Sequence, residues 1–378
     1  MQLKIKQKID QLIGGVLVGT HIIPVRTLGK LLRINHKIDK SPDQIIFIKM
    51  LGFGSLLLAS DAILAIKNRY PNAKITLIGG KGIKDGAELM QLFHQVLIID
   101  DSSFIKMIKS TIKVVLWSIK RKNKWCFDLE VYSRLTTILS LYTFSHNRFG
   151  FEFEKVNFRN YLNTHNVYFN QFIPTETNYN LMAQKVDAKV LTRYKLPFQS
   201  KGDSQILFFN NTCSDLSLQR KLTNHQAADL IEKIRNLSSY KIALIGAPND
   251  YDDNQKILNL INNQSNVENW AGKMPFYKLI ETMASSGKCL ITIDSAPLHI
   301  ASRIQIPVLA IWGPTQPESI VPNWLRESDL YREINLKVSC SPCVHHTKEL
   351  PCKGNNFCIK DMESITIVNE FFNLINHV

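Results

Sequence analysis

The sequence lacks several features that would place it in well-defined classes of protein. No apolar run reaches the roughly 18–20 residues of a membrane-spanning helix. The longest candidate near the start, Leu12–Ile23, is interrupted by three glycines, a threonine and a histidine. It is followed by no small-x-small cleavage site, so we do not expect a cleaved signal peptide. We find neither short repeats nor low-complexity tracts, and a globular protein is expected.

The sequence lacks the third glycine of a dinucleotide-binding fingerprint. Gly52-Phe53-Gly54 provides the first two positions, but Leu57 stands where the third glycine is needed. A dehydrogenase is therefore a poor match to this sequence.

Acidic residues are too few to balance the basic ones. The 378 residues contain 46 Lys and Arg against 32 Asp and Glu, a net charge of +14 at pH 7. Such an excess favours an anionic partner: a membrane surface, nucleic acid or a phosphorylated glycan. An ordinary solvated surface is the alternative. We disfavour nucleic acid because no aromatic-basic motif or recognition helix stands out.

The basic residues concentrate in two segments. Residues 1–40 hold eight Lys and Arg and form an apolar-rich leader, for which we expect one or two helices and peripheral attachment to an anionic membrane. Residues 105–124 hold seven and no acid. Here Lys106, Lys109 and Lys113 alternate with aliphatic residues at helical spacing, which predicts a basic amphipathic face.

Beyond the leader, short apolar runs alternate with segments of helical periodicity. Such alternation predicts parallel sheets covered on both faces. Expected strands include 44–50, 74–78, 205–209, 241–245, 289–293 and 308–312, and the irregular region 157–200 is expected to contain a helix at 178–192. The fold class is therefore α/β, with a leader at 1–40, one doubly wound domain at 41–200 and a second at 201–378.

Phosphate-suited residues follow four expected strands of the second domain. Asp294 and Ser295 open a helix that contains His299, and a helix start offers free N–H groups to a diphosphate. The alternative is structural: Asp294 caps the helix and His299 packs in the core. The other strand ends provide hydroxyls, cations, a carboxylate and a rigid turn, and the residues are Thr212, Ser214, Arg220, Lys221, Gly246, Asp250, Pro314 and Thr315. Four such strand ends together favour a nucleotide-diphosphate site.

The motifs resemble those of glycosyltransferase family 9, the heptosyltransferases of lipopolysaccharide synthesis. The resemblance runs from about residue 41 to the end, and it is carried by Phe47–Pro71, Phe127–Glu130, Arg148–Gly150, Asp294–His299, Trp312–Pro317 and Cys340–Cys343. It implies a GT-B enzyme, with two Rossmann-like domains facing each other across a cleft. It further implies inverting, metal-independent transfer from a nucleotide-diphosphate sugar, typically ADP-heptose, to a lipid-linked glycan at the cytoplasmic membrane face. Met274 joins the expected donor site on this basis.

The sequence departs from the family pattern at two positions. The acceptor-side loop, with Gly52 and Gly54, usually continues with an aspartate proposed as the general base, but here Ser55 follows. A serine hydroxyl is not basic at pH 7. Three alternatives stay open: Asp61 or Glu130 serves as the base, the acceptor needs little base assistance, or the protein is a catalytically impaired binder of nucleotide sugar or glycan. The second departure is Ala296, where the family has glycine.

Four of the seven cysteines crowd into one short segment. Cys340, Cys343, Cys352 and Cys358 have spacing compatible with a structural zinc site. Free thiols or a disulfide pair are the alternatives. No cofactor is expected to be required for catalysis.

Overall fold

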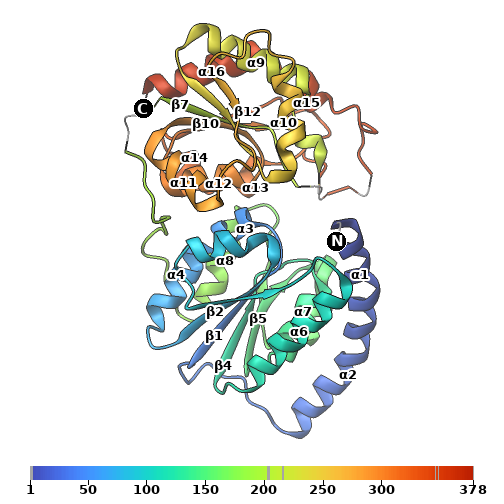
Figure 1. Ribbon diagram of the computed structural model, residues 1–378. Coiled ribbons are helices and arrows are strands. Elements are labelled where there is room, and N and C mark those ends of the chain that lie inside the picture. The colour runs from blue at the N-terminus through green and yellow to red at the C-terminus, as the bar shows by residue number, and fades with distance from the viewer. Residues whose placement is uncertain (1–2, 202–204, 215–216, 345, 348, 378) are drawn as a thin grey trace. The chain divides into compact units, whose positions relative to one another are not determined.

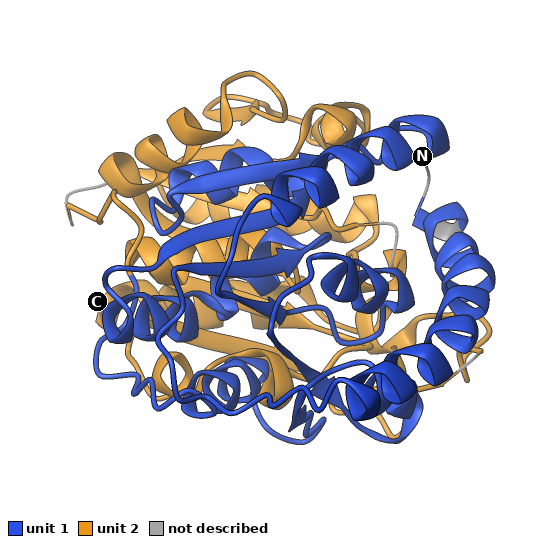
Figure 2. Ribbon diagram, turned by 90° about the horizontal axis from the view of Figure 1, so that it is seen from below, with its two compact units in different colours: residues 1–194 blue, residues 195–378 orange. Residues whose placement is uncertain are grey.

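The computed structural model describes residues 3–201, 205–214, 217–344, 346–347 and 349–377. The chain divides into two compact units, residues 1–194 and 195–378, which are coloured separately in Figure 2. Each unit contains one six-stranded sheet in which every neighbouring pair is parallel. The expected α/β fold with two doubly wound sheets is confirmed.

The sheet of unit 1 has the strand order β3-β2-β1-β4-β5-β6. Its strands are β1 (Gln44–Lys49), β2 (Lys74–Gly80), β3 (Gln95–Ile99), β4 (Lys124–Asp128), β5 (Asn147–Glu152) and β6 (His165–Tyr168). Its helices are α1 (Leu3–Ile9), α2 (Gly15–Leu31), α3 (Phe53–Leu58), α4 (Ser60–Arg69), α5 (Lys84–Leu89), α6 (Phe104–Ile119), α7 (Arg134–Tyr142) and α8 (Thr175–Gln184). The order reverses between β1 and β4, and this point is the usual ligand-binding place of such a sheet.

Unit 2 repeats this arrangement with the order β12-β11-β10-β7-β8-β9. Its strands are β7 (Ile206–Asn210), β8 (Lys241–Leu244), β9 (Val267–Asn269), β10 (Gly287–Ile293), β11 (Val308–Trp312) and β12 (Tyr331–Asn335). Its helices are α9 (Asn224–Leu237), α10 (Tyr251–Leu258), α11 (Phe276–Ser286), α12 (Ala296–Ile304), α13 (Pro317–Ile320), α14 (Asn323–Arg326), α15 (Phe357–Lys360) and α16 (Ser364–His377). Figure 1 shows these helices around the sheet. The switch point lies between β7 and β10.

The cores form where apolar strands meet apolar helix faces. In unit 2, α9 and α16 pack side by side over the sheet, and Ile231 and Phe371 are fully buried there. In unit 1, Asp128 at the end of β4 is also fully buried and accepts a hydrogen bond from Arg159 at 2.7 Å. Burial raises the pKa of Asp128 to about 6, although Arg159 opposes this shift. The pair ties β4 to the helical turn Glu154–Tyr161.

The N-terminal helices form a longer helical run than the apolar stretch 12–23 suggested. A turn of π-helix at Asp10–Gly14 joins α1 to α2, and the run Ile5–Leu31 is by length and composition sufficient to cross a membrane. This property alone is weak evidence, because core helices and signal sequences share it. The expectation of one or two leader helices is confirmed, and the helical run that contains the short apolar stretch is longer than that stretch. The sequence argument stopped at the glycines, which the helix includes.

One face of this helical run packs on the rest of unit 1. Asp10 accepts hydrogen bonds from the Ser133 hydroxyl at 2.6 Å and from the Leu135 N–H at 2.9 Å, at the start of α7. Gly14 is buried, and a Cβ placed there would lie 2.7 Å from Cβ of Arg134. The absence of a side chain therefore permits close approach to α7. The acidic residue caps a helix here, as an Asp does at an N-terminus.

Further contacts fasten the rest of the run. Lys6 pairs with Asp101, and His21 Nε2 lies 2.8 Å from the hydroxyl oxygen of Tyr142. Val18 is buried in a small apolar cluster with neighbouring parts of unit 1. The leader thus lies along the domain surface over most of its length.

Helix α6 has two apolar faces. One face packs on the sheet through buried Val114 and partly buried side chains around it. The other carries a stripe of aliphatic side chains at helical spacing, each between 42% and 66% exposed: Ile105, Ile108, Ile112, Leu116 and Ile119. The predicted basic amphipathic helix is present, and its outward face is more apolar than the lysine spacing alone indicated.

Candidate functional site

The carboxyl ends of the strands of unit 2 bring together most of the residues expected to bind a donor. Thr212 and Ser214 follow β7, Gly246 and Asp250 follow β8, Asp294 and Ser295 follow β10, and Pro314 and Thr315 follow β11. All four strands are parallel neighbours, so these residues lie at one edge of the sheet. The edge includes the switch point between β7 and β10.

Asn210, the last residue of β7, joins the two strands at the switch point. Its amide nitrogen donates to Ser295 Oγ at 2.8 Å and to Thr292 Oγ1 at 2.9 Å, and its amide oxygen accepts from Thr212 Oγ1 at 2.8 Å. These bonds fix the hydroxyl of Ser295 immediately before α12. The sequence analysis missed Asn210, although a polar residue that ends an otherwise apolar strand is a usable signal.

Arg220 is the cation that reaches the start of α12. Its Nη1 donates to the main-chain oxygen of Asp294 at 2.8 Å and lies 3.4 Å from the Asp294 carboxylate. Its other terminal nitrogen lies 3.5 Å from Ser214 Oγ. Both side chains of the ion pair are largely buried. Arg220 therefore carries a fixed positive charge beside the β10 end, where an anionic ligand would meet it.

Lys221 points to a different part of the site. Its Nζ lies 2.9 Å from Asp253 in the first turn of α10. Hydrogen bonds from Lys221 and Lys256 lower the pKa of Asp253 to about 2. Of the two cations expected at this strand end, Arg220 contacts Asp294, whereas Lys221 contacts Asp253.

Helix α12 begins at Ala296 with extended backbone at Ser295 before it. Ala296 is not among the residues with positive φ, so its methyl group causes no backbone strain there. His299 is buried, and burial lowers its pKa to about 4, with Asp294 acting in the opposite direction. Its ring is therefore neutral at pH 7 in the ligand-free protein.

The carboxylate of Asp250 closes the turn after β8 by a hydrogen bond within that turn. Asp250 Oδ2 accepts the N–H of Ala247 at 2.8 Å, and burial raises the pKa of Asp250. Gly272, with φ of +67°, donates its N–H to Gly246 at 3.3 Å, and this contact brings the half-buried Met274 loop to the same turn. The expected residues Gly246, Asp250 and Met274 therefore belong to one local unit.

Thr315 holds a buried hydroxyl without a partner. The residue is 2% exposed, and its Oγ1 finds no hydrogen-bond partner in the described part of the chain. A buried unpaired hydroxyl is costly and calls for an explanation. A ligand atom at the β11 end would supply the missing bond.

The loop that contains Gly52 and Gly54 is held by Glu130 from the neighbouring strand end of unit 1. Glu130 follows β4, and its Oε1 accepts the N–H groups of Met50 and Leu51 at 2.8 and 3.0 Å. Its other oxygen pairs with the buried Lys49 at 3.0 Å. Gly52 comes next with φ of +80°. Glu130 therefore shapes the turn that leads into α3.

The other two candidate bases are differently placed. Ser55 lies in α3 and its hydroxyl donates to the carbonyl of Gly52 at 2.9 Å, while Gly54 is buried beside it. Asp61 is 2% exposed and accepts the N–H of Tyr194 at 2.7 Å. Its carboxylate thus connects α4 to the end of unit 1 and is shielded from solvent.

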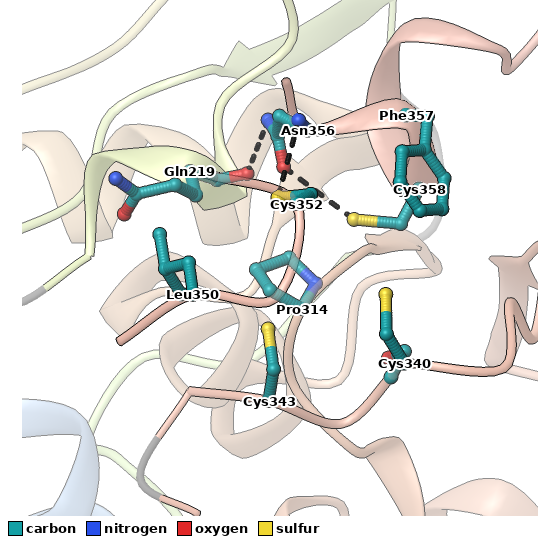
Figure 3. Close-up of a pocket in the computed structure, with 10 residues that line it drawn as sticks. Gln219, Pro314, Cys340, Cys343, Leu350, Cys352, Asn356, Phe357 and Cys358 are labelled. Atoms are coloured by element: carbon teal, nitrogen blue, oxygen red, sulfur yellow. Dashed lines mark hydrogen bonds between the residues drawn. The ribbon is translucent and has the colours of Figure 1, made fainter. Parts of the chain in front are cut away.

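The four clustered cysteines line one small cavity. Cys340, Cys343, Cys352 and Cys358 surround it together with Pro314, and Figure 3 shows their sulfur atoms directed toward the shared space. Burial raises the pKa of Cys358 to about 11, and the other three thiols raise it further. Within the described residues, however, no three His, Cys, Asp or Glu side chains are already arranged to hold an ion.

This architecture defines a class: an α/β protein of two doubly wound domains, the second with a phosphate-suited switch point. The sequence model of glycosyltransferase family 9 (heptosyltransferase) matches residues 172–353. This match confirms the expected resemblance to the family over that part of the chain.

Individual relatives extend the likeness beyond that region. The chain is 24% identical over 343 residues to lipooligosaccharide heptosyltransferase 2 of Campylobacter jejuni, covering 84% of this chain and 94% of the relative. The solved Escherichia coli ADP-heptose lipopolysaccharide heptosyltransferase II superposes with a TM-score of 0.68 at 16% identity, over 88% of this chain and 98% of that one. The Escherichia coli heptosyltransferase WaaC with ADP gives 0.66 at 10% identity, over 88% and 99%.

Proposed function

We propose that this protein is an inverting glycosyltransferase that moves a heptose or similar sugar from a nucleotide-diphosphate donor to a lipopolysaccharide-core or other lipid-linked glycan. ADP-heptose is the donor we infer, because solved relatives bind ADP or take their name from ADP-heptose. The observation that carries the proposal is the Arg220–Asp294 pair beside α12, at the switch point of a family 9 domain.

The proposed donor site holds the diphosphate by charge and hydrogen bonds from the protein. Arg220 supplies a fixed cation, Ser295 a hydroxyl held by Asn210, and Thr315 a hydroxyl without a partner of its own. The start of α12 adds its positive dipole end. Asp250 and the Met274 loop are placed for the nucleoside. We propose that these groups stabilise the leaving diphosphate without a metal ion.

His299 would change its charge state with the ligand. The neutral ring lies in the same helix as the proposed phosphate contacts, with Asp294 raising its pKa against burial. A diphosphate nearby would raise that pKa further. Proton uptake by His299 would then add a second positive charge beside the leaving group.

Inversion follows from a single displacement. The acceptor hydroxyl attacks the anomeric carbon from the face opposite the diphosphate, the bond from that carbon to the diphosphate oxygen breaks, and the hydroxyl proton passes to a base. Among the carboxylates considered, Glu130 is the better candidate, since it lies at the switch point of unit 1 and its side chain is partly exposed. Asp61 is shielded and bonded to Tyr194.

Membrane contact would bring the enzyme to its lipid-linked acceptor. The exposed aliphatic stripe of α6 and its lysines form a face suited to an anionic bilayer surface. The leader packs along unit 1 through Asp10 and Lys6, which supports attachment at the cytoplasmic membrane surface rather than a crossing helix. We therefore propose a peripheral protein of the inner face of the cytoplasmic membrane.

The direct test is turnover with purified full-length protein. ADP-heptose and a heptose-deficient lipopolysaccharide acceptor should together release ADP, and neither alone should do so. Asp294→Ala should reduce the rate, because it removes the carboxylate that orients Arg220. The exposed Asp329→Ala serves as the matched control. Turnover that is unchanged in Asp294→Ala would remove Asp294 from the site.

Ser55 favours one alternative, a catalytically impaired binder of nucleotide sugar or glycan. Its hydroxyl donates to Gly52, whereas an aspartate there would be repelled by the same carbonyl and would turn outward. If the protein binds donor without turnover for every acceptor, and Ser55→Asp restores ADP release, the alternative is correct. Turnover by the natural protein excludes it.

A further inference from the structure

The cysteine cavity belongs to an unusually long irregular segment. No helix or strand is present among the described residues between Asn335, where β12 ends, and Phe357, where α15 begins. Loops longer than about 12–15 residues without secondary structure are uncommon in compact domains. A segment that buries so little apolar surface needs another means of holding its shape, and its four cysteines all face one cavity (Figure 3).

One side of the cavity is fastened to the turn after β11. Ser341 Oγ donates to the carbonyl of Gly313 at 2.6 Å, and the N–H of Cys343 donates to the carbonyl of Pro314 at 3.1 Å. A Cβ placed on Gly313 would lie 3.4 Å from Cys358 Sγ. The cysteines therefore touch the turn that presents the unpartnered hydroxyl of Thr315.

The opposite side of the cavity reaches the loop that carries Arg220. The Asn356 side chain donates to the carbonyl of Gln219 at 2.7 Å. The N–H of Asn356 lies 3.4 Å from Cys352 Sγ, and Cys358 Sγ lies 3.4 Å from the Asn356 amide oxygen. Two of the proposed donor-binding loops thus meet at the thiol cluster.

We propose that Cys340, Cys343, Cys352 and Cys358 bind a soft first-row transition metal ion, Zn²⁺ or iron, as a closed four-thiolate site that fixes these two loops. Four-thiolate coordination is the set that both ions accept in tetrahedral geometry. A closed site leaves no open position for substrate, so the ion is structural.

Binding requires a small rearrangement of the thiols. No three of the described side chains are yet at coordinating geometry. A cysteine side chain turns about one bond, and the four sulfur atoms already face the same space. On binding, the thiols release their protons to solvent and the thiolates close on the ion at about 2.3 Å for zinc.

Metal content of the full-length protein tests the site without any sugar nucleotide. Protein purified under reducing conditions from medium supplied with zinc and iron should contain about one metal ion per chain. X-ray absorption should show four sulfur neighbours. A colourless product identifies zinc, and a thiolate-to-iron absorption band identifies iron. Less than about one tenth of an ion per chain, or neighbours that are not sulfur, would overturn the proposal.

Matched variants separate ligation from folding. Cys352→Ser should lose the metal, whereas Cys352→His should retain it, because histidine is an accepted fourth ligand. Cys213→Ser, at a cysteine of unit 2 outside the cluster, should keep the natural metal content. If all three variants contain the same amount of metal per chain, Cys352 is not a ligand and the proposed site is contradicted. A disulfide between two of the four cysteines in the purified protein, detected by mass spectrometry without reduction, contradicts it as well.

The effect on the donor loops rests on the proposed function and has its own readout. Removal of the metal with a thiol reagent and chelator should increase protease cleavage within 336–356, and ADP should bind at least several-fold more weakly. If the metal-free protein is cleaved as slowly as the metal-bound protein, the ion does not fix the two loops and this part of the proposal is overturned. If metal and cleavage behave as predicted while ADP never binds, the donor proposal fails and the metal site stands.

Discussion

Arg220 Nη1 lies 2.8 Å from the main-chain oxygen of Asp294 and 3.4 Å from its carboxylate. This pair joins the loop after β7 to the loop after β10 across the switch point of unit 2. Asp294 holds Nη1 in place, while Nη2, which lies 3.5 Å from Ser214 Oγ, keeps an N–H for an anion. Asp294 thus acts on an anionic ligand through Arg220.

Replacement of Arg220 should weaken donor use. Arg220→Ala removes the fixed cation beside α12 and leaves Asp294 unpaired, and we expect kcat/KM for the donor to fall about 10- to 100-fold. Arg220→Lys should recover only part of the loss, since a lysine cannot reproduce the forked geometry. Steady-state kinetics with varied donor measures both.

Arg235→Ala is the control for this series. Arg235 lies in the last turn of α9, which in a parallel sheet lies at the amino ends of the strands. The kcat/KM of Arg235→Ala for the donor should stay near that of the natural protein. An equal loss in Arg220→Ala and Arg235→Ala would show a general effect of lost charge and would contradict the site.

Replacement of Thr315 should separate binding from stability. Thr315→Val keeps the side-chain shape but removes the buried hydroxyl, so the unfolding midpoint should stay constant or rise. Donor affinity should fall about tenfold, equivalent to about 1.4 kcal/mol. Urea unfolding and calorimetry measure the two quantities. Thr366→Val, at an exposed position of α16, should change neither. Lower stability of Thr315→Val without weaker binding would contradict the prediction.

His299 should make the ligand-free protein sensitive to mild acid. Burial lowers its folded-state pKa to about 4, below the ordinary 6.5, so the unfolded chain binds the proton first. Stability should therefore fall as pH drops from 6.5 to 4, by on the order of 3 kcal/mol from this residue. His299→Gln should flatten this part of the urea-unfolding profile.

Two other buried groups also change the free energy of unfolding in this pH range. His165 in unit 1 has its pKa lowered to about 4 by burial, so some acid sensitivity remains in His299→Gln. Asp128 has a raised pKa of about 6, and its contribution runs the other way, with stability lost as pH rises through 6. An identical profile for natural protein and His299→Gln would show that His299 titrates normally.

The outward stripe of α6 should bind anionic bilayers. The double variant Ile112→Ser/Leu116→Ser removes two half-exposed aliphatic side chains, and we expect about tenfold weaker partition to phosphatidylglycerol-containing vesicles. Vesicle co-sedimentation measures this, and binding should weaken with salt. Phe172→Ser/Leu191→Ser, at more exposed apolar positions of the same unit, should bind as the natural protein does. Equal partition of both double variants would contradict the assignment.

The sequence predicted the long apolar strands well and the polar ones poorly. Strands β1, β7 and β11 are continuous apolar runs, and each was expected at nearly its observed bounds. Strand β5 was missed because it contains Arg148, whose guanidinium is buried and satisfied by the carbonyls of Leu162 and Ser145. Such satisfaction comes from the tertiary structure and leaves no local signal.

One helix was misplaced for a local reason. The expected helix 178–192 is observed as α8, Thr175–Gln184. Pro174 stands at its N-cap, and Asp187 has φ of +54° shortly after its end. The sequence reading gave too little weight to the proline as a start signal.

The candidate site was predictable because strand ends of a parallel sheet must meet. That rule places Thr212, Asp294 and Thr315 at one edge of the sheet from the sequence alone. It could not show that Arg220 rather than Lys221 reaches α12, that Thr315 is unpartnered, or that Asp61 is shielded. These properties depend on side-chain contacts between segments distant in sequence.

The central claim is that the strand ends of unit 2 bind a nucleotide-diphosphate sugar, and equilibrium binding of ADP-heptose to the full-length protein tests it most directly. Calorimetry should detect one site, with ADP retaining most of the affinity and Arg220→Ala weakening both ligands at least tenfold. If ADP-heptose and the corresponding UDP and GDP sugars all fail to bind, or if binding is indifferent to Arg220, the account is contradicted.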